Sequence, residues 1–306
     1  FKPGPTPAAG TILMNIQNFG WDSDFLKIAG LTEDRLCELL PPGSHGGTVS
    51  REFAERTGIQ AGLPVIMSGG DQQNAAVGLN IISPGMAEAN TGTGSFVIAY
   101  TDKPAFDPKY RVICSASAIA GKWILEASIF NTGSMYRWCK EQVYKDLDVS
   151  FDYMNEDAFD SPAGANGVMV LPPFEGSAAP YWEAMAKGVI FNLSLGTKRC
   201  DITRAMIESI ALEIADNIGL IEAQAGKIEE VSIAGGMSKS DFYANIQSSA
   251  LNKRVVRYSS EATAMGASMI ALTAMGVYDS VENAFKAMNP NPPSVFTPAS
   301  GDVDTY

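Results

Sequence analysis

The chain has 306 residues, of which 46% are hydrophobic and 18% are charged, and its formal net charge is −12. This length and apolar content allow a sizeable core in two domains or one large one. The acidity disfavours duplex nucleic acid as a partner, and no apolar run reaches the roughly twenty residues of a membrane helix. We therefore expect no nucleic-acid and no membrane partner, and we interpret the acidity as a solvated surface.

The four cysteines lie far apart and show no CxxC spacing (Cys37, Cys114, Cys139 and Cys200). They predict reduced thiols in a cytoplasmic protein instead of a disulfide framework or a zinc site. With His45 as the only histidine, a histidine-rich metal site or a Ser-His-Asp triad is hard to build. The start at Phe1, without an initiator methionine, is typical of a cut inside a longer protein or of its first ordered residues.

Residues 11–40 alternate short apolar runs with turns. Residues 32–35 predict a short helix capped by Thr32. Residues 64–68 predict a buried strand that ends in Gly69-Gly70, and residues 71–80 predict a helix.

Strands and helices alternate through the remainder of the chain. Strands are expected over 95–100, 111–119, 122–127, 167–171, 189–193, 231–234 and 254–257, and helices over 132–145, 146–160, 201–225, 239–251 and 261–275. The longest helix carries isoleucines at helical spacing, which predicts one core-facing stripe. The last of these helices is rich in small residues and can pack closely against a neighbour. The alternation predicts an α/β architecture with a mixed sheet flanked by helices.

Two turns in the first third of the chain carry the strongest chemical signal. An apolar run that begins at Val65 leads into a double-glycine turn, and Asp71 follows that turn directly. Thr91-Gly-Thr-Gly-Ser95 follows about twenty residues later. An acid can take the proton of an alcohol while glycine-turn amides hold a phosphate, with the hydroxyls of Thr93 and Ser95 as further donors. Each turn has a simpler interpretation when taken alone: Asp71 as a helix N-cap, and the second turn as a hairpin.

A third turn, Gly235-Gly236-Met-Ser238, lies between a predicted strand and a predicted helix. A base or ribose can lie flat against backbone that lacks Cβ atoms, so this layout suits a nucleotide. The simpler interpretation is close packing of the strand on the helix. The GxGxxG and GxxxxGK[ST] patterns are absent, which disfavours a dinucleotide site and a P-loop.

Taken together, eight segments occur in the order in which they occur in the FGGY carbohydrate kinases, which include glycerol kinase and xylulokinase. They are Thr11–Gln17 with Trp21-Asp22, Gly69–Gln73, Asn90–Ser95, Pro173–Trp182, Gly188–Thr197, Arg204–Ala211, Gly235–Ser238 and Glu261–Ala267. The chain therefore resembles this family over nearly its whole length.

The resemblance implies two actin-like (RNase H-like) domains with ATP and Mg²⁺ in the cleft between them. The stretch with a DxGT-type phosphate loop that opens the family is missing, so residues 1–75 resemble the tail of an incomplete first, sugar-binding domain. Residues 76–306 resemble the second, nucleotide-binding domain. Asp71 stands where the family has its catalytic base, with a further role at Mg²⁺ through a bound water, and Gln72 stands where the family contacts the sugar.

The same resemblance implies a set of ATP-binding residues. They are Gly92, Thr93, Gly94, Gly133, Arg137, Gly235, Gly236 and Ser240. Arg137 and Ser240 depart from the family pattern, because glycerol kinase usually carries glutamine and asparagine there.

The implied function is ATP-dependent phosphorylation of a sugar or polyol by an enzyme whose relatives are often homodimers. Without the missing phosphate loop, we expect the chain alone to bind nucleotide weakly and to phosphorylate little. The alternative is a non-catalytic actin-like module that binds a nucleotide or a protein partner. An intact Asp71 beside intact glycine turns favours the kinase, because a module freed from catalysis need not keep the acid.

Overall fold

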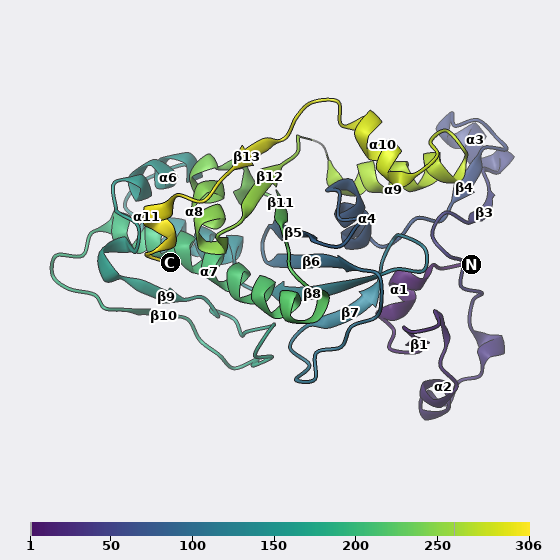
Figure 1. The fold of residues 1–306 in the computed structure, drawn as a ribbon, viewed down its shortest axis with the longest axis horizontal. Helices are drawn as coiled ribbons and strands as arrows, with labels where there is room; N and C mark the ends of the chain where they lie inside the picture. Colours follow the sequence, from purple (N-terminus) through teal and green to yellow (C-terminus); the bar gives the residue numbers. More distant parts are fainter. Residues whose placement is uncertain (1, 260) are drawn as a thin grey trace.

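The computed structural model describes residues 2–259 and 261–306. Its centre is a seven-stranded mixed sheet in the order β13-β12-β11-β5-β6-β8-β7 (Figure 1). The strands are β5 (Met86–Thr91), β6 (Ser95–Thr101), β7 (Ile113–Ala116), β8 (Trp123–Ile129), β11 (Glu230–Ala234), β12 (Arg254–Arg257) and β13 (Ser294–Phe296). β11 pairs in parallel with β5 and β12, and the other pairs are antiparallel. The predicted mixed α/β architecture is confirmed.

One face of the sheet packs against α7 (Arg199–Ala225), α5 (Gly133–Gln142) and α8 (Asp241–Leu251). Small side chains of β5 and β6, such as Ala87 and Val97, belong to the same core as Ile210 and Ile214 of α7. The predicted isoleucine stripe therefore faces the core. α6 (Phe151–Phe159) lies outside this layer, against α7 and α8.

The opposite face is covered by α4 (Asp71–Gly78) and α9 (Ala262–Ala274), with α10 (Val281–Met288) packed behind α9. α4 and α9 cross backbone against backbone. A Cβ atom on Gly78 would overlap the carbonyl oxygen of Ala262, and one on Gly266 would overlap that of Asn74. The close packing predicted for this small-residue helix is confirmed.

The N-terminal segments lie at one end of the molecule and form small, separate units (Figure 1). They are α1 (Pro5–Ala9), α2 (Ser23–Ala29), α3 (Arg51–Thr57), the pair β1 (Met14–Asn15) and β2 (Gly20–Trp21), and the pair β3 (His45–Thr48) and β4 (Pro64–Ile66). The strand predicted over 64–68 exists but is not buried, because β4 belongs to a two-stranded sheet and Val65 is 46% exposed. The capped helix predicted at 32–35 is a 3₁₀ turn, Glu33–Arg35, and the Thr32 side chain does not cap it.

The remaining elements lie at the other end of the molecule. β9 (Met169–Leu171) and β10 (Val189–Phe191) form an antiparallel arm, and α11 (Ser300–Val303) packs against α8. None of the helices in the described parts of the chain is both long and apolar enough to cross a membrane.

Candidate functional site

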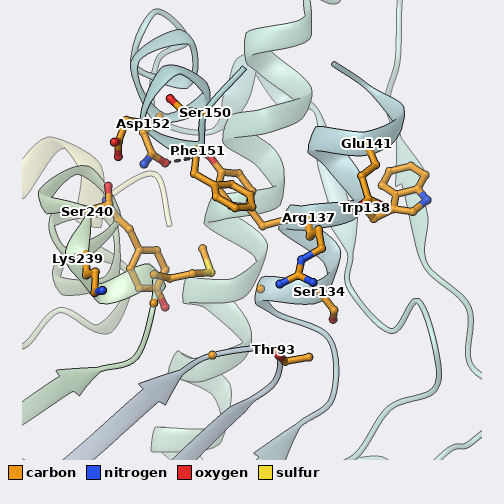
Figure 2. A pocket seen from close by; sticks show the side chains of 17 residues that line it. Thr93, Ser134, Arg137, Trp138, Glu141, Ser150, Phe151, Asp152, Lys239 and Ser240 are labelled. Atoms are coloured by element: carbon orange, nitrogen blue, oxygen red, sulfur yellow. Dashed lines mark hydrogen bonds between the residues drawn. The ribbon is translucent and has the colours of Figure 1, made fainter. Parts of the chain in front are cut away.

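A cavity of about 680 Å³ lies beside the turn that joins β5 to β6. Its wall comes from that turn, from α5, from the start of α6, and from the segment around the 3₁₀ turn η3 (Met237–Lys239) with the start of α8 (Figure 2). The volume lies within the range of small-molecule sites. Six of the eight predicted ATP-binding residues line it: Gly92, Thr93, Gly133, Arg137, Gly236 and Ser240.

The turn Gly92–Gly94 is a hairpin, as its simpler interpretation required, and it is also one wall of the cavity. Thr91 pairs with Ser95, and the Gly92 amide donates to the Gly94 carbonyl oxygen at 2.8 Å. The start of α5 packs onto this hairpin through its backbone. The amides of Gly133 and Ser134 donate at 3.0 Å to the carbonyl oxygens of Gly92 and Thr93, respectively.

This packing explains why glycine occupies positions in two separate motifs. A Cβ atom on Gly133 would overlap the Gly92 carbonyl oxygen, and one on Gly235 would overlap the Thr91 carbonyl oxygen. Gly235 also has a φ of +88°, which an L side chain rarely adopts. Gly94 and Gly235 are absent from the cavity wall, and their part is to let three turns meet at van der Waals distance.

The donors available at the turn are fewer than the motif suggested. No acceptor within the described residues takes the backbone N–H of Thr93, so this amide is free for a ligand. Ser95 is buried, and its hydroxyl donates to Thr132 Oγ1 at 3.0 Å. The interpretation of Ser95 as a donor to a phosphate is therefore wrong, because its hydroxyl already joins the hairpin to α5.

Two basic side chains border the cavity on opposite sides, Arg137 on α5 and Lys239 in η3 (Figure 2). Both are exposed, and neither forms an ion pair with any carboxylate in the described part of the chain. Unpaired cations in a cavity of a protein with a net charge of −12 favour an anionic ligand. The motifs did not predict Lys239, although it follows the Gly235-Gly236 turn by only three residues.

Ser240 joins the cavity wall to the helix behind it. Its hydroxyl accepts a hydrogen bond from the Tyr243 amide at 3.3 Å, so Ser240 is the N-cap of α8. Tyr243 is buried, and its hydroxyl lies 3.3 Å from Thr91 Oγ1 at the end of β5. α8 is thereby fixed against the strand that leads into the hairpin.

Part of the cavity wall is apolar and aromatic. Tyr136 and Phe151 stack with ring centroids 5.6 Å apart and planes 26° apart, and Met237 and Tyr243 also line the cavity. Sequence reasoning missed all four. Bulky residues on a helix are more often core than ligand contacts, and the sequence carries no signal that distinguishes the two.

Asp71 and Gln72 do not line this cavity. Asp71 is the first residue of α4, and Gly70 is the N-cap, so the N-cap interpretation of Asp71 is wrong. The Asp71 side chain is exposed, and its Oδ1 accepts from the Gln72 amide at 2.9 Å. The turn before it is held in place, because the Gly70 amide donates to Thr6 Oγ1 at 2.8 Å.

Two glutamates lie beneath α4 on the same face of the sheet. Glu88 of β5 and Glu126 of β8 both pair with Ile98 of β6, so they flank that side chain. Burial raises the pKa of Glu88 to about 8, with the charge of Glu126 as a further cause. Burial also raises the pKa of Glu126, and the charge of Asp71 adds to that shift, which indicates that Glu126 lies near Asp71.

Across residues 2–259 and 261–306, no group of three or more histidine, cysteine, aspartate or glutamate side chains is arranged to hold a metal ion. A magnesium ion that arrives with a nucleotide needs only one or two carboxylates beside phosphate oxygens and water. The carboxylate of Asp71 is exposed, so it can serve as one such ligand.

The fold superposes closely on known carbohydrate kinases. A xylulose kinase from Lactobacillus acidophilus has a TM-score of 0.93 at 23% identity, covering 100% of this chain and 61% of its own. The structure of Plasmodium falciparum glycerol kinase with ADP has a TM-score of 0.88 at 24% identity, covering 99% of this chain and 60% of its own. The predicted actin-like fold is thereby confirmed.

Curated relatives and family models carry the assignment further. Glycerol kinase from Thermococcus gammatolerans is 34% identical over 278 residues, which are 90% of this chain and 55% of the relative. A Shewanella glycerol kinase is 32% identical over 292 residues, which are 92% of this chain and 57% of the relative. The chain thus spans little more than half the length of these relatives. The models of the N-terminal and C-terminal domains of the FGGY family of carbohydrate kinases match residues 4–78 and 87–275, respectively. The chain therefore belongs to the FGGY family of carbohydrate kinases.

Proposed function

We propose that the protein transfers the γ-phosphoryl group of ATP to a hydroxyl group of a sugar or polyol. The observation that carries the proposal is the cavity at which three glycine turns meet, with a free Thr93 amide and the unpaired cations Arg137 and Lys239. A site of this kind suits the phosphates of a nucleotide. The crystal structure of Plasmodium falciparum glycerol kinase with ADP supports the choice of ATP as the ligand.

In this proposal the hairpin side of the cavity holds the phosphates, and the η3 side holds the nucleoside. The proposed nucleotide-binding set is Gly92, Thr93, Gly94, Gly133, Arg137, Gly235, Gly236 and Ser240, with Gly94 and Gly235 acting through the shape of the turns. Lys239 joins this set because its ammonium group has no acidic partner among the described residues. A bound Mg²⁺ would neutralise phosphate charge, and Asp71 would hold it through a water molecule.

Asp71 is the proposed general base and Gln72 a proposed contact to the acceptor. Asp71 would take the proton of the acceptor hydroxyl while that oxygen forms its bond to the γ-phosphorus and ADP departs. Exposure of the carboxylate at the start of α4 leaves it accessible to a substrate. We further propose a division into residues 1–75, on the acceptor side, and 76–306, on the nucleotide side, which the two family-model matches support. A cytoplasmic homodimer completes the proposal by analogy with the family.

The test is phosphoryl transfer measured as ADP release, with glycerol, xylulose and gluconate as acceptors, the last two named by solved relatives. Replacing Asp71 with Asn keeps the shape of the side chain and removes the base. We expect turnover to fall by roughly 10²–10⁴-fold while the dissociation constant for ADP, measured without Mg²⁺, stays unchanged. Glu183→Asn, a change at an exposed acid outside the cavity, is the control and is expected to leave turnover unchanged.

A turnover loss of less than about tenfold in Asp71→Asn would show that another group takes the proton. Nucleotide binding without transfer to any acceptor, in a chain joined to the phosphate-loop segment that opens the family, would instead favour the non-catalytic actin-like module.

A further inference from the structure

The antiparallel arm formed by β9 and β10 has one face on the core and one face in solvent. Successive residues of a strand point to opposite faces of a sheet, and directly paired residues of two strands share a face. Val170 and Ile190 are paired, and both side chains pack in the core that contains the α7 isoleucines. The opposite face of the arm carries Met169 and Leu171 of β9 and Val189 and Phe191 of β10.

These four residues, which we call the arm face, form one contiguous apolar patch. Met169 pairs with Phe191 and Leu171 pairs with Val189, so the side chains lie beside one another across the two strands. Each is between 38% and 52% exposed. Single exposed apolar side chains are ordinary on a protein surface, whereas adjoining ones mark an interaction surface. Methionine and aromatic side chains are also enriched in protein interfaces.

The charge of the arm is compatible with a second copy of the chain as the partner. With a net charge of −12, two copies repel each other on average. Residues 161–174 and 184–200, which include both strands, contain no aspartate and no glutamate. Their charged residues are Lys187, Lys198 and Arg199. Contact between the arms of two copies therefore brings no carboxylates of these segments together.

We propose that the arm face is the contact surface between two copies of this chain. A two-fold axis through the arm places the apolar face of one copy on the same face of the other, as in an isologous dimer. The arm lies at the end of the molecule away from the N-terminal segments, within residues 4–78, which match the N-terminal domain of the family (Figure 1). Contact through the arm therefore leaves those segments uncovered. This inference rests on the homodimer of the proposed function and places its interface.

The test is the monomer–dimer dissociation constant, measured by sedimentation velocity at concentrations up to about 100 μM. We expect the unsubstituted chain to form a dimer. Phe191→Lys removes one apolar side chain from each copy and brings two cations into the interface, so it should raise the dissociation constant on the order of 100-fold. Ile28→Lys is the matched control, because Ile28 is an exposed isoleucine of α2 among the N-terminal segments. It should leave the constant unchanged.

The salt dependence separates this interface from one held by ion pairs. The arm has cations but no acids for them to pair with, so raising NaCl from about 0.05 M to about 0.5 M should leave the dissociation constant unchanged or lower it. Circular dichroism verifies that Phe191→Lys is folded, and Val189→Lys, on the same face, provides a second variant.

A dimer that high salt weakens, or one that folded arm-face variants leave intact, would overturn the arm as the interface. A dimer weakened equally by Ile28→Lys would do the same. A chain that stays monomeric at the highest concentration would overturn the homodimer as well. The proposed phosphoryl transfer is measured separately as ADP release, so its failure is distinguishable from each of these outcomes.

Discussion

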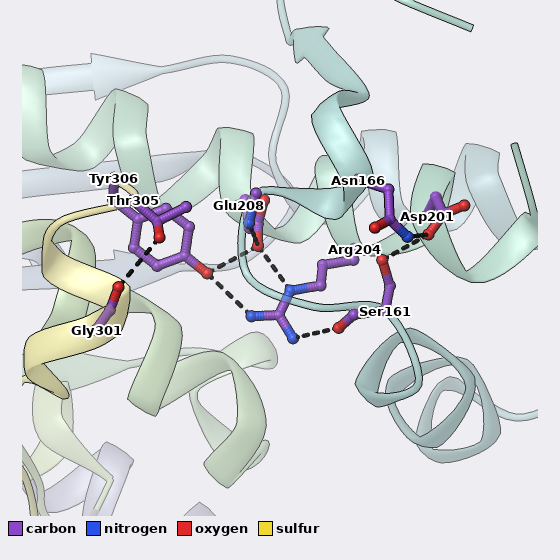
Figure 3. Close-up of polar contacts among 9 residues, drawn as sticks. Ser161, Asn166, Asp201, Arg204, Glu208, Gly301, Thr305 and Tyr306 are labelled. Atoms are coloured by element: carbon purple, nitrogen blue, oxygen red, sulfur yellow. Dashed lines mark hydrogen bonds and ion pairs between the residues drawn. The ribbon is translucent and has the colours of Figure 1, made fainter. Parts of the chain in front are cut away.

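The two faces of the central sheet differ in whether their buried ionisable side chains have hydrogen-bond partners. Next to the α7 face, Arg204 and Glu208 form an ion pair at 2.7 Å, and Tyr306, the Ser161 carbonyl group and the Gly164 amide supply further partners (Figure 3). On the α4 face, Glu88 is fully buried, and neither of its carboxylate oxygens has a partner in the described part of the chain.

The ion pair of Arg204 and Glu208 stabilises the fold. The burial of Glu88 without a partner is not explained by folding alone. A buried charge is tolerated when hydrogen bonds replace its lost hydration, and a native group left without them calls for another reason. Glu88 lies on the same face as Glu126, which is near Asp71. The unsatisfied acid therefore belongs to the side of the sheet that carries the proposed base.

The largest effect is expected from breaking the satisfied network. Arg204→Met removes the cation and leaves the carboxylate of Glu208 buried without its main partner. The free energy of unfolding should fall by about 3–5 kcal/mol, measured by urea denaturation. The double variant Arg204→Met with Glu208→Leu is the control, because replacing both charges with apolar groups should recover most of that loss. A double variant as unstable as the single one would show that lost packing, and not the stranded charge, is the cause.

The next effect comes from how each face is packed. Gly266→Ala places a methyl group on a backbone carbonyl of α4, so the two helices must separate, at a cost of about 3 kcal/mol in stability. Gly219→Ala is the matched control, since Gly219 is an exposed glycine of α7 with open space around it. That change should stabilise the protein by about 0.5–1 kcal/mol. Similar melting temperatures for the two variants would contradict the backbone-to-backbone crossing of α4 and α9.

The third effect, the smallest when it is measured over a single pH unit, is a pH dependence that belongs to the unsatisfied face. The pKa of Glu88 is about 8 in the folded chain against a usual value of 4.5, so the folded state retains a proton that the unfolded state releases. Stability should therefore fall as the pH rises between these values, by up to about 1.4 kcal/mol per pH unit.

Glu88→Gln abolishes this contribution, so its stability relative to the unsubstituted protein should increase from pH 5 to pH 8. Urea denaturation at a series of pH values measures the difference between the two. Parallel profiles would indicate that Glu88 has a partner that neutralises it.

The sequence predicted those parts of the fold that repeat along the chain. The isoleucines of α7 recur at helical spacing, which indicates the packing of α7 on the sheet. Gly78 and Gly266 lie within small-residue segments, which indicate the close crossing of α4 and α9. The strand β5 (Met86–Thr91) was not predicted. Its residues, including Glu88 and Asn90, have low strand propensity, and its neighbours in the sheet impose the extended conformation.

The candidate site was predictable only where backbone geometry restricts the residue type. Glycine at 133 and 235 is required by the contact between turns, and that requirement is visible as a motif. Tyr136, Phe151 and Lys239 reach the cavity because α5, α6 and η3 are folded against one another. Tyrosine, phenylalanine and lysine at such positions are equally compatible with core or surface, so no local pattern distinguishes them.

The meeting of three turns from distant parts of the chain has a consequence for the protein in a cell. Segments 91–94, 131–134 and 235–238 come together only when the sheet is complete, so a ligand held there binds the folded chain and ignores the unfolded one. By mass action, a ligand present at a hundred times its dissociation constant adds about 2.7 kcal/mol to the free energy of unfolding. Wherever that ligand is abundant, it would mask mildly destabilising substitutions, and they would become apparent only when the ligand is depleted.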